Sequence, residues 1–215
     1  IDQNNDRTKS YFKDVEDLQK KLFSEIKGKI KLDDTSLKFK DTKFYYWGKT
    51  EKKGDYGKKV RQLIDGSKPE EIFWDGDVEK KRLKADFFST GATSVSHCDN
   101  YLAYSLDLQG SEYYTIYLRN LKTGKELTDI IPNTGGSITW SLDSKSFFYS
   151  KLDKYHRPMS IYKHTIGKNI NDDHLIYEEK DDSFTCSIGL SSDEKYFIIS
   201  TGNHMTYEEY FFSCN

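Results

Sequence analysis

The sequence contains few cysteines and prolines, and each shortage excludes a class of protein. Its three cysteines, Cys98, Cys186 and Cys214, lie far apart and form no C-x-x-C pair. An odd number of widely spaced cysteines predicts neither a disulfide framework nor a zinc site, and we expect reduced thiols. Only three prolines and 14 glycines occur, so the composition is not that of a disordered or collagen-like chain.

Long apolar runs and an excess of charge of one sign are also missing. No stretch approaches the roughly 18 apolar residues that span a membrane, and residues 1–7 are too polar for a signal peptide. Lys and Arg number 33 against 35 Asp and Glu, so no overall field attracts nucleic acid or an anionic membrane. We therefore expect a cytoplasmic protein without a nucleic-acid or membrane partner.

A ten-residue pattern that occurs three times is the strongest signal in the sequence. The copies are SHCDNYLAYS at 96–105, SLDSKSFFYS at 141–150 and SSDEKYFIIS at 191–200, so they start 45 and 50 residues apart. Each copy is a short polar turn followed by an aromatic or apolar strand that ends in Ser. This period is typical of β-propeller blades, which are four-stranded sheets of roughly 40 to 50 residues.

An amphipathic helix is predicted before the repeats. Between Ser10 and about Lys27, apolar residues recur every three or four positions, and Gly28 is a plausible end. The apolar positions are Phe12, Val15, Leu18, Leu22 and Ile26. Such a stripe usually packs on its own protein, which we expect here, and binding to a partner helix is the alternative.

The chain as a whole is predicted to be mainly β, with a helical segment at 1–36 and a partial β-propeller at 37–215. The blades are expected at about 37–78, 86–131, 134–179 and 183–215, the last of them truncated. Strands are expected at 43–47, 58–64, 70–74, 101–105, 113–119, 126–129, 146–150, 160–165, 174–178, 196–200 and 207–212. This gives about three and a half blades, fewer than a closed ring needs. Because the sequence begins with Ile1 and stops within a strand, we expect it to be part of a longer protein.

The usual catalytic signatures do not occur in the sequence. It has neither a G-x-S-x-G nucleophile turn nor a phosphate-binding glycine loop. Gly135-Gly136-Ser137 lacks a second flanking glycine and precedes a strand, so we interpret it as a structural hairpin. We predict no catalytic, cofactor-binding or metal-binding residue in this chain, and no cofactor.

The histidines and the acidic pairs also have structural interpretations. The histidines fall at blade turns and strands, without the i, i+4 spacing of a helical metal site; they are His97, His156, His164, His174 and His204. The acidic pairs at 33–34, 172–173 and 181–182 are interpreted as solvated turn residues.

A basic stretch from Lys38 to Arg61 offers an alternative. It holds nine Lys or Arg against three acidic residues, and aromatic residues lie between them. This mixture could stack on and neutralise single-stranded RNA. However, the run Phe44-Tyr45-Tyr46-Trp47 is contiguous, so some of its rings must face a core.

A family resemblance is carried by the order and spacing of several motifs. They are FFSTG at 87–91, LAYSLDLQGSEYYTIYLRNLKTGKEL at 102–127, TGGSITW at 134–140, FFYSKLDKYHRPMSIYKHTIG at 147–167 and HMTYE at 204–208. In this order the chain resembles the N-terminal part of the prolyl oligopeptidase family of serine peptidases, in particular its oligopeptidase B (protease II) branch. The pair Cys98-Asp99 departs from the Asp-Gly of the family, which leaves only that turn in doubt.

The resemblance implies a fold and a function. Members have a seven-bladed propeller that caps an α/β-hydrolase domain carrying the catalytic Ser, Asp and His, and the oligopeptidase B branch cleaves short peptides after Lys or Arg. None of the catalytic positions falls in this sequence. The implied role is a non-catalytic size filter, with a C-terminal α/β-hydrolase domain on the same or a separate polypeptide as partner and short basic peptides as substrate. The alternative is an autonomous or split β-propeller that binds another protein.

Overall fold

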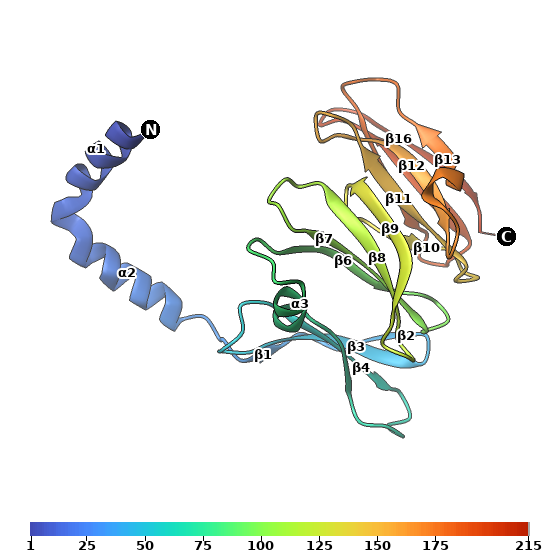
Figure 1. The fold of residues 1–215 in the computed structure, drawn as a ribbon, viewed down its shortest axis with the longest axis horizontal. Helices are drawn as coiled ribbons and strands as arrows, with labels where there is room; N and C mark the ends of the chain where they lie inside the picture. Colours follow the sequence, from blue (N-terminus) through green and yellow to red (C-terminus); the bar gives the residue numbers. More distant parts are fainter. Residues whose placement is uncertain (215) are drawn as a thin grey trace.

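Two helices project away from the strands that form the rest of the molecule (Figure 1). The computed structural model describes residues 1–214. Helix α1 (Asp2–Phe12) and helix α2 (Glu16–Gly28) are separated by a 3-10 turn, η1 (Lys13–Val15). The predicted end at Gly28 is confirmed, but the helical region begins earlier than predicted and is interrupted. Residues 2–9 are almost wholly polar, and apolar periodicity detects only a helix with an apolar face.

The apolar stripe of these helices does not pack on the described chain. Neither α1 nor α2 buries a residue, and Leu18, Phe23 and Ile26 are 54%, 68% and 62% exposed. The prediction that the stripe packs on its own protein is therefore wrong for residues 1–214.

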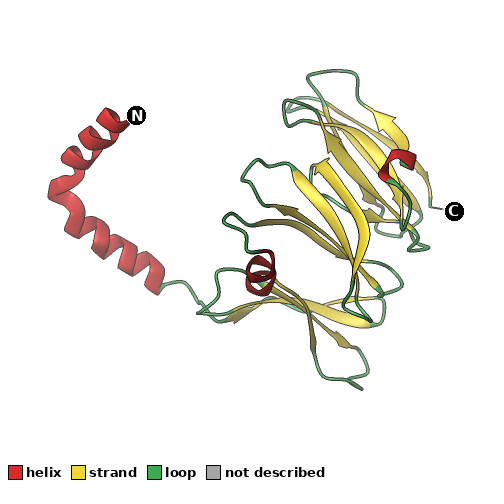
Figure 2. Cartoon of the chain, viewed as in Figure 1, coloured by secondary structure: helices red, strands yellow, loops and turns green. Residues whose placement is uncertain are grey.

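The strands form antiparallel sheets that fan out side by side (Figure 2). The first sheet contains β1 (Asp34–Thr35), β2 (Phe39–Asp41), β3 (Phe44–Thr50), β4 (Lys58–Leu63) and β5 (Glu71–Asp75), and helix α3 (Gly76–Leu83) follows it. The second contains β6 (Ser89–Val95), β7 (Tyr101–Asp107), β8 (Tyr114–Asn120), β9 (Glu126–Thr134), β10 (Thr139–Trp140), β11 (Ser146–Leu152), β12 (Pro158–Thr165) and β13 (His174–Glu178), with the 3-10 turn η2 (Ile170–Asp172) before β13. The third contains β14 (Thr185–Leu190), β15 (Tyr196–Gly202) and β16 (Tyr207–Ser213).

The second sheet consists of two blade-like units that share backbone hydrogen bonds. Strands β6 to β9 form one antiparallel unit and β10 to β13 the next. The long strand β9 reaches β11, where Thr134 pairs with Lys151 and the Gly135 N–H donates to the Ser150 carbonyl at 3.0 Å. The predicted mainly β, partial propeller fold and its strands are confirmed, whereas the boundaries between domains stay a prediction.

The hydrophobic core consists of layers that lie between neighbouring blades. A central strand of a blade contributes side chains to the layer on each of its two faces. Leu102, Tyr104 and Leu106 of β7 pack with Trp74 on one side, while Ala103 belongs to the layer shared with the next blade. Successive residues of a strand point to opposite faces, so a blade with neighbours on both sides needs apolar residues at consecutive positions. This explains why the repeated strands read as apolar runs. Each large buried side chain contributes about 1.5–3 kcal/mol.

The turn at the start of each repeat has one geometry in all three copies. Its fourth residue adopts a left-handed backbone, with φ of 60° at Asp99, 58° at Ser144 and 58° at Glu194. In two copies the third residue is an aspartate, Asp143 or Asp193, that accepts hydrogen bonds from a serine hydroxyl and a backbone N–H. The first copy has Cys98 there and still forms the turn, so the doubt raised by Cys98-Asp99 is resolved.

Cys98 is expected to be alkylated at least about tenfold faster at pH 7.5 than Cys186 or Cys214, because the thiolate is the reactive form. Partial burial tends to raise the pKa of the Cys98 thiol, but hydrogen bonds from Ser96, Asn100 and Ser144 outweigh this effect and lower it. Burial, with the charge of Glu179 as a lesser cause, raises the pKa of Cys186 to about 12, and burial also raises that of Cys214. Mass spectrometry after brief iodoacetamide treatment measures the three rates. Equal labelling of the folded chain would contradict this assignment.

Candidate binding pocket at the blade rims

Three loops at one rim of the blades are stabilised in the same way. In each of them, a side-chain oxygen accepts hydrogen bonds from backbone N–H groups of the loop. In the β7–β8 loop, Asp107 accepts from the N–H groups of Gln109, Gly110 and Glu112 at 2.8–3.0 Å. Burial opposes the effect, but these N–H groups lower the pKa of the Asp107 carboxyl. Asp153 serves the β11–β12 loop and Asn203 the β15–β16 loop in the same way. The rim is therefore held in a defined shape.

Side chains clamp the β7–β8 and β11–β12 loops together. The Tyr113 ring lies 4.1 Å from that of His156, centroid to centroid, and the Tyr113 hydroxyl donates to the Asp153 carbonyl at 2.7 Å. Arg157 binds the Asp153 carboxylate at 2.7 Å and also donates to the Asp182 carbonyl, just before β14. Three consecutive blades thus meet at this rim.

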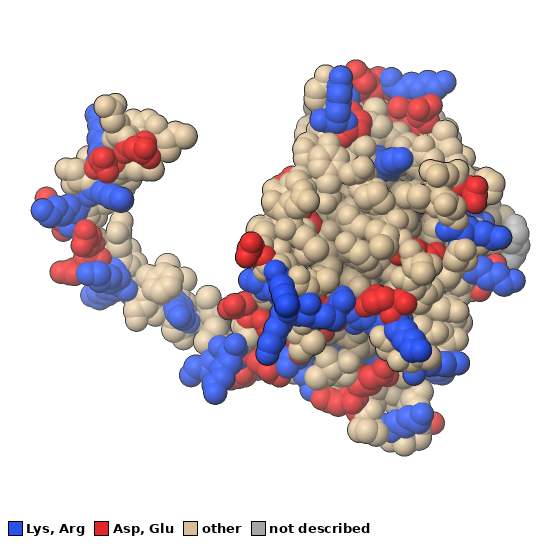
Figure 3. Space-filling view, viewed as in Figure 1, with Lys and Arg blue, Asp and Glu red and all other residues tan. Residues whose placement is uncertain are grey.

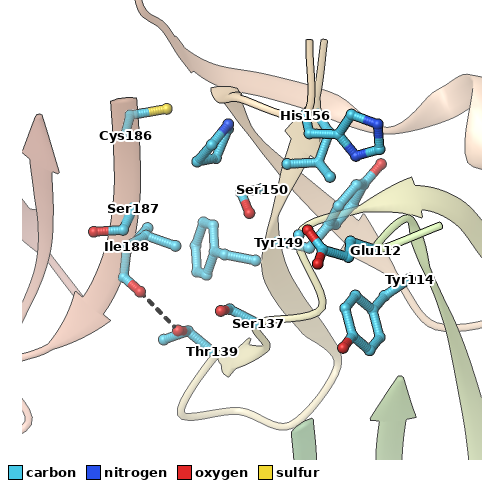
Figure 4. Close-up of a pocket in the computed structure, with 14 residues that line it drawn as sticks. Glu112, Tyr114, Ser137, Thr139, Tyr149, Ser150, His156, Cys186, Ser187 and Ile188 are labelled. Carbon is cyan, nitrogen blue, oxygen red and sulfur yellow. Dashed lines mark hydrogen bonds between the residues drawn. The ribbon is translucent and has the colours of Figure 1, made fainter. Parts of the chain in front are cut away.

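A pocket of about 460 Å³ opens where these blades meet (Figure 4). We call it the rim pocket; its lining residues are Glu112, Tyr114, Gly135, Ser137, Thr139, Phe148, Tyr149, Ser150, Leu152, His156, Pro158, Cys186, Ser187 and Ile188. Thr139 donates to the Ile188 carbonyl at 3.0 Å across one side, which joins β10 to β14 (Figure 4). Glu112 and His156 reach it from the two clamped loops. The pocket has a mixed lining, in which several hydroxyl groups and a single carboxylate lie among aromatic and aliphatic side chains.

The glycine turn between β9 and β10 forms part of the pocket wall. Gly136 has φ of +84°, and its carbonyl accepts from the Ser105 hydroxyl at 2.7 Å. A Cβ on Gly135 would lie 2.7 Å from the Ser150 Oγ, and one on Gly136 would lie 3.0 Å from the Tyr114 ring. Glycine is required here by close packing between blades. The segment is structural, as predicted, but it is not a hairpin, because β10 pairs with β11 and β9 pairs with β8 and β11 rather than with β10.

The basic stretch at 38–61 is paired in part, because four of its nine Lys and Arg residues form ion pairs. Lys49 pairs with Glu70, Lys58 with Glu51 and Asp75, and Arg61 with Glu71. Figure 3 shows blue and red side chains intermixed over this part of the surface. Tyr46 and Trp47 are buried, as expected for rings that face a core. Four of the nine basic side chains and two of the aromatic rings are thus engaged within the chain, and RNA binding by the others stays an untested alternative.

One buried polar cluster escaped the sequence analysis. The ring of His164, in β12, lies 2.7 Å from Asp173 Oδ1 through Nδ1 and 2.9 Å from Asp129 Oδ1 through Nε2. All three side chains are at most 2% exposed, so the interpretation of Asp173 as a solvated turn residue is wrong. The acidic pair that it forms with Asp172 suggested a polar turn, but the Asp173 carboxylate lies inside the blade, where it also accepts from the Tyr149 hydroxyl of β11 at 2.8 Å. The cluster joins β9 of one blade to β12 of the next.

Within residues 1–214, no three His, Cys, Asp or Glu side chains are grouped to hold a metal ion. No described helix is long and apolar enough to span a membrane. That the chain carries no catalytic residue stays a prediction.

Comparison with known proteins identifies the family to which this fold belongs. The family described as "Prolyl oligopeptidase, N-terminal beta-propeller domain" matches residues 1–215. The chain is 30% identical to dipeptidyl aminopeptidase BI of Pseudoxanthomonas mexicana, over 89% of this chain and 28% of that relative. It is 29% identical to protease 2 of Moraxella lacunata, over 77% of this chain and 25% of that relative. The chain therefore spans less than a third of the length of these relatives.

Solved structures agree in fold. Oligopeptidase B from Leishmania major has a TM-score of 0.87 at 23% identity, covering 96% of this chain and 29% of that one. Oligopeptidase B from Trypanosoma brucei, in a closed form with covalently bound antipain, has a TM-score of 0.85 at 25% identity, covering 98% and 30%.

Proposed function

Because the chain belongs to the prolyl oligopeptidase family through its N-terminal β-propeller domain, we propose that it is the propeller part of a serine oligopeptidase that hydrolyses short peptides after Lys or Arg. In this role the propeller carries no catalytic residue. It covers a C-terminal α/β-hydrolase domain, on the same or a separate polypeptide, and admits only short peptides. The observation that carries the proposal is the match along the whole chain, which the likeness to oligopeptidase B in fold supports.

The physical basis of the filter is steric. Blades arranged around a narrow axis leave too little room for a folded protein, and an active site between two domains is reached only after they move apart. We further propose a cytoplasmic location, which the free thiols of all three cysteines fit.

Unpartnered apolar surfaces fit this arrangement. The helix stripe described above is exposed, as are Tyr207 and Phe211 of the edge strand β16, at 76% and 71%. An open strand edge with exposed aromatic residues favours pairing with another strand. Further blades and a hydrolase domain would cover both surfaces.

We expect the purified chain to leave a fluorogenic peptide ending in Arg or Lys uncleaved. The native polypeptide, recovered from its source cell with an antibody to this chain, is expected to exceed the 25.1 kDa of these residues and to cleave that peptide but not a folded protein. Turnover by the purified chain would refute the proposed role. A native mass near 25 kDa without hydrolase activity would instead favour the alternative, a free-standing or split interaction module.

A further inference from the structure

A second pocket, of about 640 Å³, lies between the first sheet and the β6–β9 blade. We call it the junction pocket; it is lined by residues 43–44, 61–63 and 68–71 of the first sheet and by residues 99–100 and 121–122 of the next blade. Asp99 and Asn100 precede β7 and Lys122 follows β8, whereas the β7–β8 loop joins the other ends of these two strands. The junction pocket therefore lies at the opposite rim from the rim pocket, and the two share no lining residue.

The carboxylates of the junction pocket already have basic partners. Glu71 lies 3.0 Å from Arg61, and Asp99 lies 3.4 Å from the ammonium of Lys43. The third carboxylate, that of Glu70, pairs with a lysine outside the pocket. Each acidic lining residue is thus neutralised within the chain.

Two lysines of the same pocket have no such partner. Within residues 1–214, the ammonium groups of Lys68 and Lys122 form no ion pair, hydrogen bond or cation–π contact. Lys68 precedes β5 in the first sheet, and Lys122 follows β8 in the next blade. The pocket therefore carries two positive charges, one from each side of the junction, that the described chain does not neutralise.

Hydrogen bonds fix the backbone of the turns that carry these lysines. The Asn120 side chain accepts from the Lys122 N–H at 2.9 Å. In the β4–β5 turn, the Asp65 carboxylate accepts from the Ser67 N–H at 2.9 Å, next to Lys68. A ligand would have to order only the lysine side chains, which lowers the entropy cost of binding.

The lining between the charges is partly apolar. Phe44, Leu63 and Leu121 line the pocket and are half-buried. The Arg61 guanidinium lies over the Phe44 ring, 4.4 Å from its centroid, and Arg61 is 5% exposed. An apolar group that entered the pocket would remove this surface from water, which is favourable.

We propose that the junction pocket binds a small dianion that carries an apolar body, such as an aryl phosphate or an aryl dicarboxylate. Lys68 and Lys122 hold the anionic group from the two sides of the junction, and the apolar body lies against Phe44 and Leu121. The site goes beyond the proposed function, because it lies at the opposite rim from the rim pocket and requires no hydrolase domain.

Other ligand classes fit the junction pocket less well. A cation would meet two ammonium groups, while the carboxylates that could attract it are paired. Calcium and magnesium need several oxygen ligands in one shell, and these carboxylates are engaged with basic side chains. A neutral apolar ligand would leave both ammonium groups without a counter-ion.

Ligand-observed NMR tests the proposal, because it applies both to this chain and to the native polypeptide. The probes are phenyl phosphate and benzylsuccinate, which are dianions with a ring near pH 7.5, inorganic phosphate, which lacks the ring, and benzyl alcohol, which lacks the charge. At low salt, at least one ring-bearing dianion is expected to bind saturably and about tenfold more tightly than inorganic phosphate or benzyl alcohol. The tighter of the two dianions identifies the anionic group. Raising the salt to about 0.5 M should weaken its binding.

Two variants and a matched control locate the site. Lys68→Met and Lys122→Met are each expected to weaken binding of that dianion about threefold, and the double variant about tenfold. Lys125→Met removes an exposed lysine of the same β8–β9 turn that does not line the pocket, and binding should be unchanged. The circular dichroism spectrum of each variant reports its folding.

Several results would overturn the proposal. They are the absence of saturable binding by both dianions, equal binding of inorganic phosphate or benzyl alcohol, and equal effects of Lys122→Met and Lys125→Met. Tighter binding of a single-stranded hexanucleotide through the same lysines would also overturn it, in favour of nucleic acid. None of these outcomes depends on whether the native polypeptide is a peptidase, so the two proposals fail separately.

Discussion

Replacing His164 by phenylalanine is expected to lower the free energy of unfolding by about 3–5 kcal/mol. Phenylalanine keeps a ring of similar size, so the contact with Phe147, at 5.4 Å between centroids, is largely retained. What is lost is the donor to Asp129 and the donor to Asp173, two carboxylates at most 2% exposed. Asp129 would keep only the Gly167 N–H as a donor and Asp173 only the Tyr149 hydroxyl, and buried carboxylates with so few donors are strongly unfavourable.

The expected loss of stability depends on the two ring nitrogens of His164. Both ring nitrogens of His164 lie within hydrogen-bond distance of a carboxylate oxygen, whereas a neutral imidazole has one N–H. Phenylalanine has no ring nitrogen and can form neither of these two hydrogen bonds. Asp129 Oδ2 already has no partner in the described chain, so little compensation is available.

Urea unfolding, followed by tryptophan fluorescence, measures the loss. His174→Phe alters an exposed histidine of β13 and is expected to change stability by less than about 0.5 kcal/mol. Adding Asp129→Asn and Asp173→Asn to His164→Phe removes the uncompensated charges and should restore part of the loss. Equal effects at His164 and His174 would show that the cluster contributes nothing.

Arg119→Met is expected to lower the free energy of unfolding by about 3 kcal/mol. The guanidinium lies 2.8 Å from Glu79 of α3 and 2.6 Å from Glu126 of β9, and it is 13% exposed. Methionine retains an apolar stem of similar length but loses the charge and the guanidinium that lies over the Tyr104 ring, 5.2 Å from its centroid. Glu79, 6% exposed, would then depend on Arg82 alone.

A matched control separates the ion network from a general loss of positive charge. Arg7→Met alters an exposed arginine of α1 without a described partner, and its unfolding free energy should match that of the parent chain. Hydrogen exchange should also rise in α3 of Arg119→Met, since Arg119 ties this helix to β8 and β9. A loss below about 0.5 kcal/mol would mean that the pair is solvated.

The strands were predictable because their signal is local. The apolar runs of β7, β11 and β15 and the turns at Gly66 and Gly124 depend on residues that are neighbours in sequence. Helix α3 was not predicted, although Asp75 caps it by accepting from Asp77 and Val78. Its eight residues have no apolar stripe, and Arg119, more than 30 positions away, supplies its main anchor.

The rim pocket could be predicted only in part. Asp107, Asp153 and Asn203 follow the serine at the end of each repeat by two or three positions, and this recurrence was a usable signal for three ordered loops. Nothing local indicates that Glu112 has a left-handed backbone, with φ of 61°, or that it lines the same pocket as Ser150 and Ser187. Those facts depend on how three blades pack. The partners of His164 are likewise separated from it, by 35 positions for Asp129.

The backbone link between β9 and β11 affects the mechanics of the arc. Thr134 and Lys151 tie the two middle blades together through the main chain, whereas the flanking junctions depend on side chains, such as Arg61 to the Asp99 carbonyl at 3.0 Å and Thr139 to the Ile188 carbonyl at 3.0 Å. Blades in a row deform like springs in series, so the softest junctions take up most of any strain. The blades β6–β9 and β10–β13 then move together as one rigid body. The arc bends at the junction before β6 and at the junction before β14.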